Sequence, residues 1–361
     1  MKNLSKLLAL LLALAMCLSL AACGGGDTTT TDNTADTTED AAPAEDAAPA
    51  EDAAPAEDAA PAEGQTYQIG ICQLVQHDAL DAATSGFKQA VIDGLGEENV
   101  TFDEQNAQGD STTCSTIVTG FVANNYDLIM ANATPAVQAA VAATSEIPIL
   151  GTSVTDYGAA LADPDMDPAA GTGINVSGTS DGVPAQEYVD LVFELVPEAK
   201  NISVLYCSAE ANSVLQAEQF KEAAEAQGAV VTIFTFADSN DIQSVVTAAV
   251  DGADALYIPT DNTAASNMTI ISNVCQGVNM PVICGEENMM ANGGLATVSI
   301  SYYDIGYECG KQAVSILKDG ADVSTMAIGY ASNPVKEYNP EYAEAIGFAV
   351  PEGFTAYTPA E

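Results

Sequence analysis

The chain has very few positively charged residues. Its 361 residues include no arginine, no tryptophan and a single histidine, His77, and all eight basic residues are lysines. Against them stand 51 acidic residues, which give a formal net charge of −43. Binding to nucleic acid or adsorption to anionic lipid is not expected, because too few cations are present to pair with phosphates. Without arginine, an anionic group on a ligand must be held by hydroxyls, backbone N–H groups or lysine.

Motifs of catalysis and cofactor binding are also missing. The chain has no G-x-S-x-G elbow and no G-x-x-x-x-G-K-[ST] loop, and Gly70 and Gly86 do not form a dinucleotide fingerprint. The acidic alternation over 163–167 resembles a calcium loop, but Pro168 stands where that loop needs glycine. We therefore expect a protein that is not an enzyme, with no catalytic residue, no cofactor and no metal.

Six of the eight cysteines lie beyond residue 66, at positions 72, 114, 207, 275, 284 and 309. They form no C-x-x-C pair and have no histidine cluster beside them, so a zinc site is not expected. Cys72 and Cys207 fall within apolar, strand-like runs and are predicted to be small core residues. Whether Cys275 and Cys284 form a disulfide depends on an oxidising compartment and stays open.

The N-terminal segment has the pattern of a bacterial lipoprotein signal. Lys2 and Lys6 precede an apolar stretch over 7–20, which ends in Leu-Ala-Ala-Cys at Cys23. This stretch is shorter than the roughly 20 residues that a spanning helix needs. We expect residues 1–23 to be the signal peptide with its lipobox and Cys23 to carry the lipid, which anchors the protein at the extracytoplasmic face of the membrane. An ordinary cleaved signal and an uncleaved anchor are the alternatives.

Residues 24–66 contain almost nothing that can form a core. A Thr/Asp stretch leads into repeats of Ala-Ala-Pro-Ala-Glu-Asp from Ala41 onward. Proline removes hydrogen-bond donors and the regular acids repel one another, so the segment is predicted to be a disordered, extended spacer.

From Tyr67 onward the pattern alternates between short β-rich runs and amphipathic helical segments. The strands predicted first are 67–74, 100–105, 126–130, 147–150 and 173–176, with helices over 79–94, 111–124 and 134–144 between them. The same rhythm then starts again. The later strands are 202–206, 230–234, 255–258, 282–284 and 296–300, and the later helices are 185–195, 213–227, 242–250, 264–276 and 305–317. The pattern predicts an α/β protein of two doubly wound parallel-sheet lobes, with ligands bound beyond the carboxyl ends of the strands in a hinged cleft.

The loops that follow the predicted strands collect hydroxyls, amides and carboxylates. An amino-acid zwitterion suits them: its carboxylate would take donors from Thr134, Ser153 and Thr155 and from helix N-termini. Its ammonium would take acceptors from the carboxylates of Asp156, Glu210 and Asp261, with Asp261 as the expected ion-pair partner. The complete set of predicted ligand-binding residues is Gln73, His77, Thr134, Ser153, Thr155, Asp156, Glu210, Asn212, Ser213, Asp261, Asn262 and Glu286.

Each of these residues also has a purely structural interpretation. Thr134, Ser153 and Asp261 are equally suited to capping a helix or closing a turn. His77 lies at the first strand-to-helix turn, where capping, ligand contact and hinge contact all stay open. Tyr157 is placed either to stack on a flat ligand or to cover the edge of a lobe.

Taken together, these segments resemble the solute-binding proteins of ABC importers in the tryptophan/tyrosine-type family, which have the type 1 periplasmic-binding-protein fold. The resemblance covers most of residues 67–350. The segments that carry it are 70–73, 77–81, 105–110, 133–135, 155–156 before 160–161, 175–181, 205–206, 210–213, 259–263 and 302–306. This sequence has Asp78, Tyr157 and Cys207 at positions where the family pattern has proline, proline and asparagine.

The resemblance implies capture of an amino acid, foremost an aromatic one, and its delivery to a permease pair with a cytoplasmic ATPase. It also implies three crossovers between the lobes, near residues 178, 303 and 332. Lobe 1 would then contain 67–178 and 304–331, and lobe 2 would contain 179–303 and 332–361. A sensory binder that uses the same cleft for a small polar ligand is the alternative.

Overall fold

The computed structural model describes residues 66–331 and 334–359. The predicted signal peptide with its lipidation site Cys23, and residues 24–65 of the predicted spacer, lie outside the described residues. Within the described part, no helix combines the length and the apolar character needed to cross a membrane.

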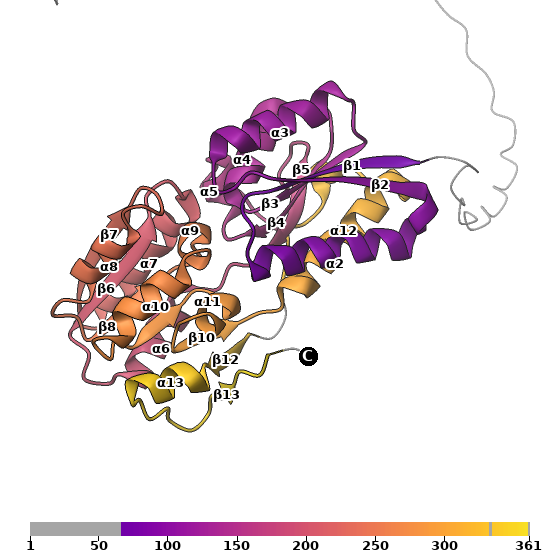
Figure 1. Ribbon diagram of the computed structural model, residues 1–361. Helices are drawn as coiled ribbons and strands as arrows, with labels where there is room; N and C mark the ends of the chain where they lie inside the picture. Colours follow the sequence, from indigo (N-terminus) through magenta and orange to yellow (C-terminus); the bar gives the residue numbers. More distant parts are fainter. Residues whose placement is uncertain (1–65, 332–333, 360–361) are drawn as a thin grey trace, which may run out of the picture. The chain divides into compact units, whose positions relative to one another are not determined.

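A six-stranded parallel sheet forms the first lobe (Figure 1). Its order is β11-β5-β4-β3-β1-β2, so β1 to β5 follow the 2-1-3-4-5 order of a doubly wound sheet. The strands are β1 (Tyr67–Gln73), β2 (Val100–Asn106), β3 (Leu128–Asn132), β4 (Ile149–Val154), β5 (Val176–Ser180) and β11 (Gly329–Tyr330). The helical segments are α2 (Asp78–Leu95), η1 (Glu97–Asn99), α3 (Ser111–Ala123), α4 (Thr134–Ala143), α5 (Tyr157–Leu161), α12 (Tyr302–Asp319) and η2 (Val323–Thr325).

Each face of this sheet carries its own hydrophobic core, because successive side chains of a strand point to opposite faces. On β1, Ile71 packs in a cluster with Phe87 of α2 and Cys309 of α12. The next residue, Cys72, belongs instead to the cluster that contains Cys114 of α3. Helices α2 and α12 therefore cover one face, and α3 and α4 cover the other (Figure 1).

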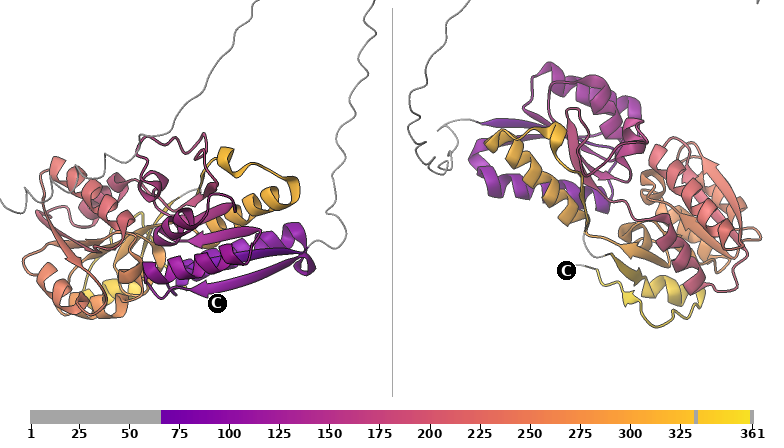
Figure 2. Two further views of the ribbon diagram at one scale, coloured as in Figure 1. Left: turned by 90° about the horizontal axis from the view of Figure 1, so that it is seen from above. Right: turned by 180° about the vertical axis from the view of Figure 1, so that it is seen from behind.

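Helices α2 and α12 lie side by side in every view, although more than 200 residues separate them in sequence (Figures 1 and 2). Glycines at the crossing let the backbones approach. A Cβ at Gly86 would lie 2.1 Å from the carbonyl oxygen of Tyr303, and a Cβ at Gly306 would lie 2.0 Å from that of Ala83. Any larger residue would push the helices apart.

The second lobe is built on a seven-stranded sheet of order β13-β12-β10-β9-β8-β6-β7. Its strands are β6 (Asn201–Cys207), β7 (Val230–Phe236), β8 (Ala255–Ile258), β9 (Val282–Cys284), β10 (Ala296–Ser299), β12 (Val335–Tyr338) and β13 (Thr355–Ala356). Its helices are α6 (Ala185–Leu195), α7 (Ala211–Ala226), α8 (Ile242–Ala249), α9 (Asn262–Ala265), α10 (Met268–Gln276), α11 (Glu287–Ala291) and α13 (Pro340–Ile346). The prediction of two doubly wound α/β lobes is thus confirmed, and β6 to β10 repeat the 2-1-3-4-5 order of the first lobe.

Two strands, β12 and β13, run against the expected all-parallel arrangement, since β13 pairs parallel with β12. β12 pairs antiparallel with β10, with Val335 opposite Ser299 and Tyr338 opposite Ala296. The chain comes from β11 in the other sheet and joins this one beside the carboxyl end of β10, so the new strand must run backward along it.

Three predicted elements are misplaced. The strand expected over 147–150 is β4, which spans Ile149–Val154 and so ends four residues later than predicted. The strand expected over 173–176 is β5, which begins at Val176 and ends at Ser180, so its carboxyl end lies four residues later than predicted. Gly173 precedes this strand with a φ of 72°, a conformation outside the β region. The helix expected over 264–276 is two helices, α9 and α10, which break at Ser266 and Asn267.

All six cysteines within the described ranges are buried and carry free thiols. Cys72 and Cys207 lie in the two cores, as predicted. Cys275 and Cys284, for which a disulfide was left open, are both free and share the core of the second lobe.

Candidate functional site

Residues from both sheets meet around a small cavity, called the chamber below. The loops after β1, β4, β5, β8 and β9 contribute to its walls, all at the carboxyl ends of their strands, as does the start of α12. This is the position where doubly wound sheets bind ligands. The chamber encloses about 10 Å³ and is lined by His77, Leu80, Ser153, Thr155, Asp181, Thr260, Asp261, Asn262, Ala265, Glu286 and Tyr302.

Several buried polar atoms at the chamber have no hydrogen-bond partner within the described protein. Among the lining residues these are Nδ1 of His77, Oγ of Ser153 and Oδ1 of Asp181. Oγ1 of Thr134, the first residue of α4, is also buried and unpaired. Buried polar atoms in native proteins are almost always paired, so unpaired ones need an explanation. Their concentration at one cavity indicates a site that is completed by a polar ligand.

The hydroxyls are placed by unusual backbone conformations. Ala133 has a φ of 89° and Ser153 a φ of 55°, both in the left-handed region that residues with a Cβ rarely adopt. The irregular register of β4 lies between Gly151 and Val154 and so brackets Ser153. Ala133, as the N-cap of α4, has no side chain to bond the first N–H groups of the helix. Strain of this kind tends to persist where function requires it, and here it supports hydroxyl donors next to a helix N-terminus.

Three carboxyl groups line the chamber, and no lysine does. Burial raises the pKa of Glu286 to about 8, and burial together with the nearby charge of Glu210 raises the pKa of Asp261 to about 8. Burial also raises the pKa of Asp181, opposed by the hydroxyl of Tyr302, which donates to its Oδ2 over 2.7 Å. The chamber therefore favours a ligand group that brings positive charge and hydrogen-bond donors.

Polar contacts join the two lobes beside the chamber. The Nε2 atom of His77, just before α2, lies 3.2 Å from Oδ1 of Asn262 in the second lobe. The Nδ2 group of Asn292 donates to the carboxylate of Asp78 over 3.2 Å. A recess of about 230 Å³ adjoins the chamber, and His77 and Glu286 line both spaces.

Half of the predicted site residues line the chamber: His77, Ser153, Thr155, Asp261, Asn262 and Glu286. Two of them also serve the fold. Asp261 accepts from the N–H groups of Cys207 and Ala264, and so caps α9. Glu286 accepts from the N–H groups of Asn288 and Met289, and so caps α11.

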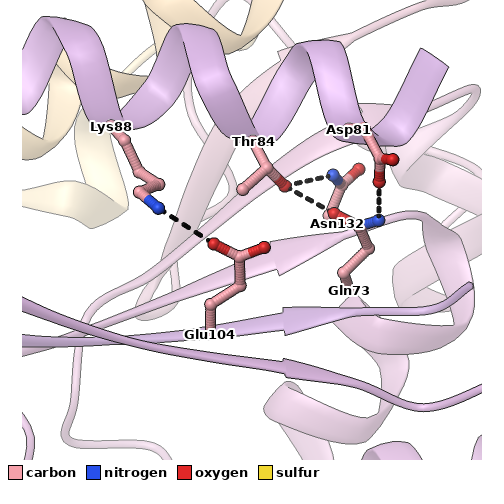
Figure 3. A network of polar contacts seen from close by, with 6 residues as sticks. All are labelled: Gln73, Asp81, Thr84, Lys88, Glu104 and Asn132. Atoms are coloured by element: carbon pink, nitrogen blue, oxygen red, sulfur yellow. Dashed lines mark hydrogen bonds and ion pairs between the residues drawn. The ribbon is translucent and has the colours of Figure 1, made fainter. Parts of the chain in front are cut away.

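Gln73 lies outside the lining and belongs to a structural network under α2 (Figure 3). Its Nε2 group donates to Asp81 over 2.6 Å, and its Oε1 accepts from Thr84 over 2.7 Å. Thr84 in turn accepts from Asn132. Both polar atoms of the Gln73 side chain therefore already have partners within the first lobe.

The remaining predicted residues support the chamber from outside its lining. Asp156 caps α5 by accepting from the N–H of Ala159 and lines a separate cavity, which does not fit the role of an ammonium acceptor. Asn212 donates to the carbonyl of Thr260, which holds a chamber loop in place. Thr134, Glu210 and Ser213 are likewise buried near the chamber without lining it.

Tyr157 is a core residue. Its side chain is only 3% exposed, and its hydroxyl donates to the carbonyl of Gly151 over 2.9 Å. Stacking on a ligand is therefore not its role, since the ring lies inside the first lobe.

Five lining residues were not predicted from the sequence: Leu80, Asp181, Thr260, Ala265 and Tyr302. Asp181 directly follows β5, and the misplaced strand end hid it from a search of post-strand loops. A strand drawn to Ser180 would have identified it by the same rule that identified Glu286.

The fold and the chamber define a two-lobed binding protein for a small polar molecule. Residues 68–359 match the family model described as "ABC transporter substrate binding protein". The chain belongs to this family and is a binder rather than an enzyme.

Similar proteins agree with this assignment. The chain is 38% identical to a tyrosine-binding protein of Clostridioides difficile over 252 residues, which are 69% of this chain and 72% of that protein. An ABC domain from Streptococcus pneumoniae in complex with L-Trp is 33% identical, covers 81% of this chain and 99% of its own, and superposes with a TM-score of 0.76. The ligand-free, open structure of a substrate-binding protein with adhesive properties from Clostridium difficile is 37% identical, covers 82% of this chain and 100% of its own, and gives a TM-score of 0.61.

Proposed function

We propose that this protein captures an amino acid with an aromatic side chain and delivers it to the permease of an ABC importer from the extracytoplasmic face of the membrane. The observation that carries the proposal is the group of unpaired buried polar atoms at the chamber. The related structure in complex with L-Trp and the related tyrosine-binding protein support the aromatic amino acid.

The two ends of an amino acid would meet different parts of the site. Its carboxylate would accept hydrogen bonds from the hydroxyls of Ser153 and Thr134 and from N–H groups at the start of α4, which take the place of arginine. Its ammonium would bond Asp181, with Asp261 and Glu286 nearby. A positive charge that arrives among these buried carboxyls would favour their ionised forms and so strengthen the attraction.

Capture requires the lobes to move. The chamber encloses about 10 Å³, room for roughly one water molecule, so an amino acid enters only when the lobes separate. Once bound, it contacts groups of both lobes and favours the arrangement in which they meet. A lipid on Cys23 would hold the loaded protein near its permease and raise its effective concentration there.

The absence of tryptophan from the chain gives a direct test. Excitation near 295 nm would report added L-tryptophan alone, and its emission should shift to the blue when the indole leaves water. Calorimetric titration with L-tryptophan, L-tyrosine, L-phenylalanine, L-leucine and L-aspartate would rank the ligands. We expect the aromatic amino acids to bind tightest, and failure of all three to bind at millimolar concentration would refute the proposal.

A further inference from the structure

The single histidine, His77, lies at the end of a chain of hydrogen bonds that begins on a buried glutamate of the other lobe. We propose that Glu210 and Asn262 hold His77 in the Nε2–H tautomer, so that its Nδ1 atom accepts a hydrogen bond from an N–H or O–H group of the ligand. The hydrogen bond from a ligand rests on the proposed function. The tautomer of His77 can be measured without a ligand.

The bonds to Glu210 fix the orientation of the Asn262 side-chain amide. Glu210 is buried, and its two carboxylate oxygens accept four hydrogen bonds from the start of α9. One oxygen accepts from the backbone N–H of Asn262 over 3.0 Å and from its Nδ2 group over 2.7 Å. The other accepts from the N–H and the hydroxyl of Thr263. Because a carboxylate only accepts, Nδ2 must face Glu210 and Oδ1 must face away from it.

The orientation of the Asn262 amide sets the position of the proton on the imidazole. Oδ1 of Asn262 lies 3.2 Å from Nε2 of His77, and a carbonyl oxygen only accepts. The proton of the neutral ring must therefore sit on Nε2, which leaves Nδ1 as an acceptor. Burial lowers the pKa of His77 and keeps the ring neutral, against the opposing influence of Asn262, Glu210, Asp81 and Asp78.

The other ring nitrogen, Nδ1, is buried and has no partner within the described protein, and the residue that carries it lines the chamber. A buried acceptor left unpaired lowers stability, so a ligand that donates there binds in preference to one that does not. The acids that face the ring are Asp78 and Asp81 on α2, Glu210, and the chamber residues Asp181, Asp261 and Glu286. These negative groups favour a ligand donor that carries positive charge, such as an ammonium.

The arrangement also ties binding to contact between the lobes. The same ring bonds Asn262 through one nitrogen and would bond the ligand through the other. A ligand that orders the ring therefore strengthens the contact between the lobes, and disruption of that contact weakens the ligand site. Glu210 acts in this scheme as a positioning residue, since it does not line the chamber itself and acts on His77 through Asn262.

Nuclear magnetic resonance on the ¹⁵N-histidine-labelled full chain can test the tautomer without ambiguity, because the chain has one imidazole. The protein must carry a histidine-free affinity tag. At pH 7.5 we expect the Nε2–H tautomer, and L-tryptophan should shift the Nδ1 resonance in the direction of an accepted hydrogen bond. An Nδ1–H tautomer or an imidazolium would overturn the inference. If the tautomer is as stated but no amino acid binds, the proposed function fails while the relay stands.

Two substitutions of His77 distinguish the roles of its two ring nitrogens. His77→Gln keeps an N–H group near the position of Nε2 and loses the acceptor at Nδ1, whereas His77→Asn keeps an acceptor near Nδ1 and cannot reach Asn262. We expect His77→Gln to weaken L-tryptophan binding about tenfold or more, as measured by calorimetry on variants whose circular dichroism matches the parent. We expect His77→Asn to retain more affinity than His77→Gln. Wild-type affinity in His77→Gln would overturn the contact.

The positioning role of Glu210 needs a readout that a merely structural role would not change. Glu210→Gln places an amide opposite the Asn262 amide, so Asn262 can turn and present Nδ2 to the histidine. We expect an Nδ1–H population to appear in the imidazole spectrum together with weaker binding. Glu222→Gln, at an exposed position of α7, is the matched control and should change neither. A loss of affinity in Glu210→Gln with an unchanged imidazole spectrum would overturn the relay.

Discussion

The two carboxylate oxygens of Asp181 have different surroundings. One oxygen accepts from the hydroxyl of Tyr302 over 2.7 Å, and the other is buried without a partner. The hydroxyl bond fixes the orientation of the carboxylate, which lowers the entropic cost of binding a ligand ammonium.

We predict that Asp181→Asn weakens binding of L-tryptophan by tenfold or more, because a charged hydrogen bond in a buried site is lost. Calorimetric titration measures the change. Glu187→Gln removes a negative charge from an exposed position of α6 and is the control. It should bind L-tryptophan like the parent. Equal affinity in Asp181→Asn and the parent would remove Asp181 from the ligand site.

The buried carboxyls also predict how stability depends on pH. The pKa values of Asp261 and Glu286 are each about 8 in the folded protein, against about 4 in an unfolded chain. The folded state therefore holds protons that the unfolded state releases, and the free energy of unfolding falls as pH rises from about 4 through about 8. His77, whose pKa is lowered, acts in the opposite direction below about pH 6.5.

Urea unfolding at pH 6.5 and pH 9 spans the range over which these carboxyls ionise in the folded protein. We expect the parent to lose stability over this range, and Glu286→Gln, whose amide oxygen can still cap α11, to lose less. Glu222→Gln should show the pH dependence of the parent. If Glu286→Gln follows the parent curve, the raised pKa of Glu286 is excluded as its cause.

Part of the site could be predicted from the sequence, because a residue after a strand lies at the carboxyl edge of the sheet. That rule identified His77, Asp261 and Glu286. It gave Gln73 and Glu210 the same weight. Their polar atoms bond Thr84 and Asn262, which lie 11 and 52 residues away in the sequence, so no local pattern shows these bonds. Tyr157 posed the same difficulty, because its burial depends on a hydroxyl contact formed only in the folded lobe.

At the scale of elements, the crossing of α2 and α12 most clearly limits which residues can be accommodated. Gly306 of α12 lies against the backbone of Ala83, and Gly86 of α2 lies against that of Tyr303. We predict that Gly306→Ala destabilises the protein by about 1–3 kcal/mol, because the added methyl group forces the helices apart. Chemical denaturation measures the change.

Gly120 provides the matched control for this substitution. It lies in the interior of α3, and a Cβ there would meet nothing within 4 Å. Gly120→Ala should therefore stabilise the protein by about 0.5–1 kcal/mol, since alanine loses less backbone entropy in a helix. Equal effects of the two substitutions would show that the crossing tolerates a methyl group.

Helix periodicity predicted both partners of this crossing, over 79–94 and 305–317, to within a few residues of the observed bounds. It could not predict that they lie side by side, because the contact joins segments more than 200 residues apart. Short elements such as α5, α11 and β11 were missed, since five residues or fewer show no periodicity that a pattern can detect.

At the scale of the molecule, the two lobes have separate interiors. One core cluster serves the second lobe and two serve the first. A small cluster that includes Ala79, Ala83, Ile300, Tyr302 and Ile305 spans the junction. The repeated βα rhythm predicted this division, whereas the reversed strand β12 depends on where the chain re-enters the sheet, which no local pattern shows.

We predict that a ligand makes the lobes unfold more cooperatively, because it bonds groups of both. In scanning calorimetry without ligand, the calorimetric enthalpy should exceed the van't Hoff enthalpy, and saturating L-tryptophan should bring their ratio close to one while raising Tm. Asp181→Asn should reduce both effects at the same ligand concentration. A ratio of one without ligand would show that the lobes already unfold together.

The burial of all six thiols in the described part of the chain has a practical consequence. Maleimide dyes attach to exposed cysteines, so a cysteine introduced at exposed Asn292 would be the favoured point of attachment within those residues. Asn292 bonds Asp78 across the lobe boundary, and a fluorophore there would sense a change of surroundings whenever the halves shift. The same packing that keeps sulfur away from solvent thus makes this scaffold suitable for a reagentless optical biosensor.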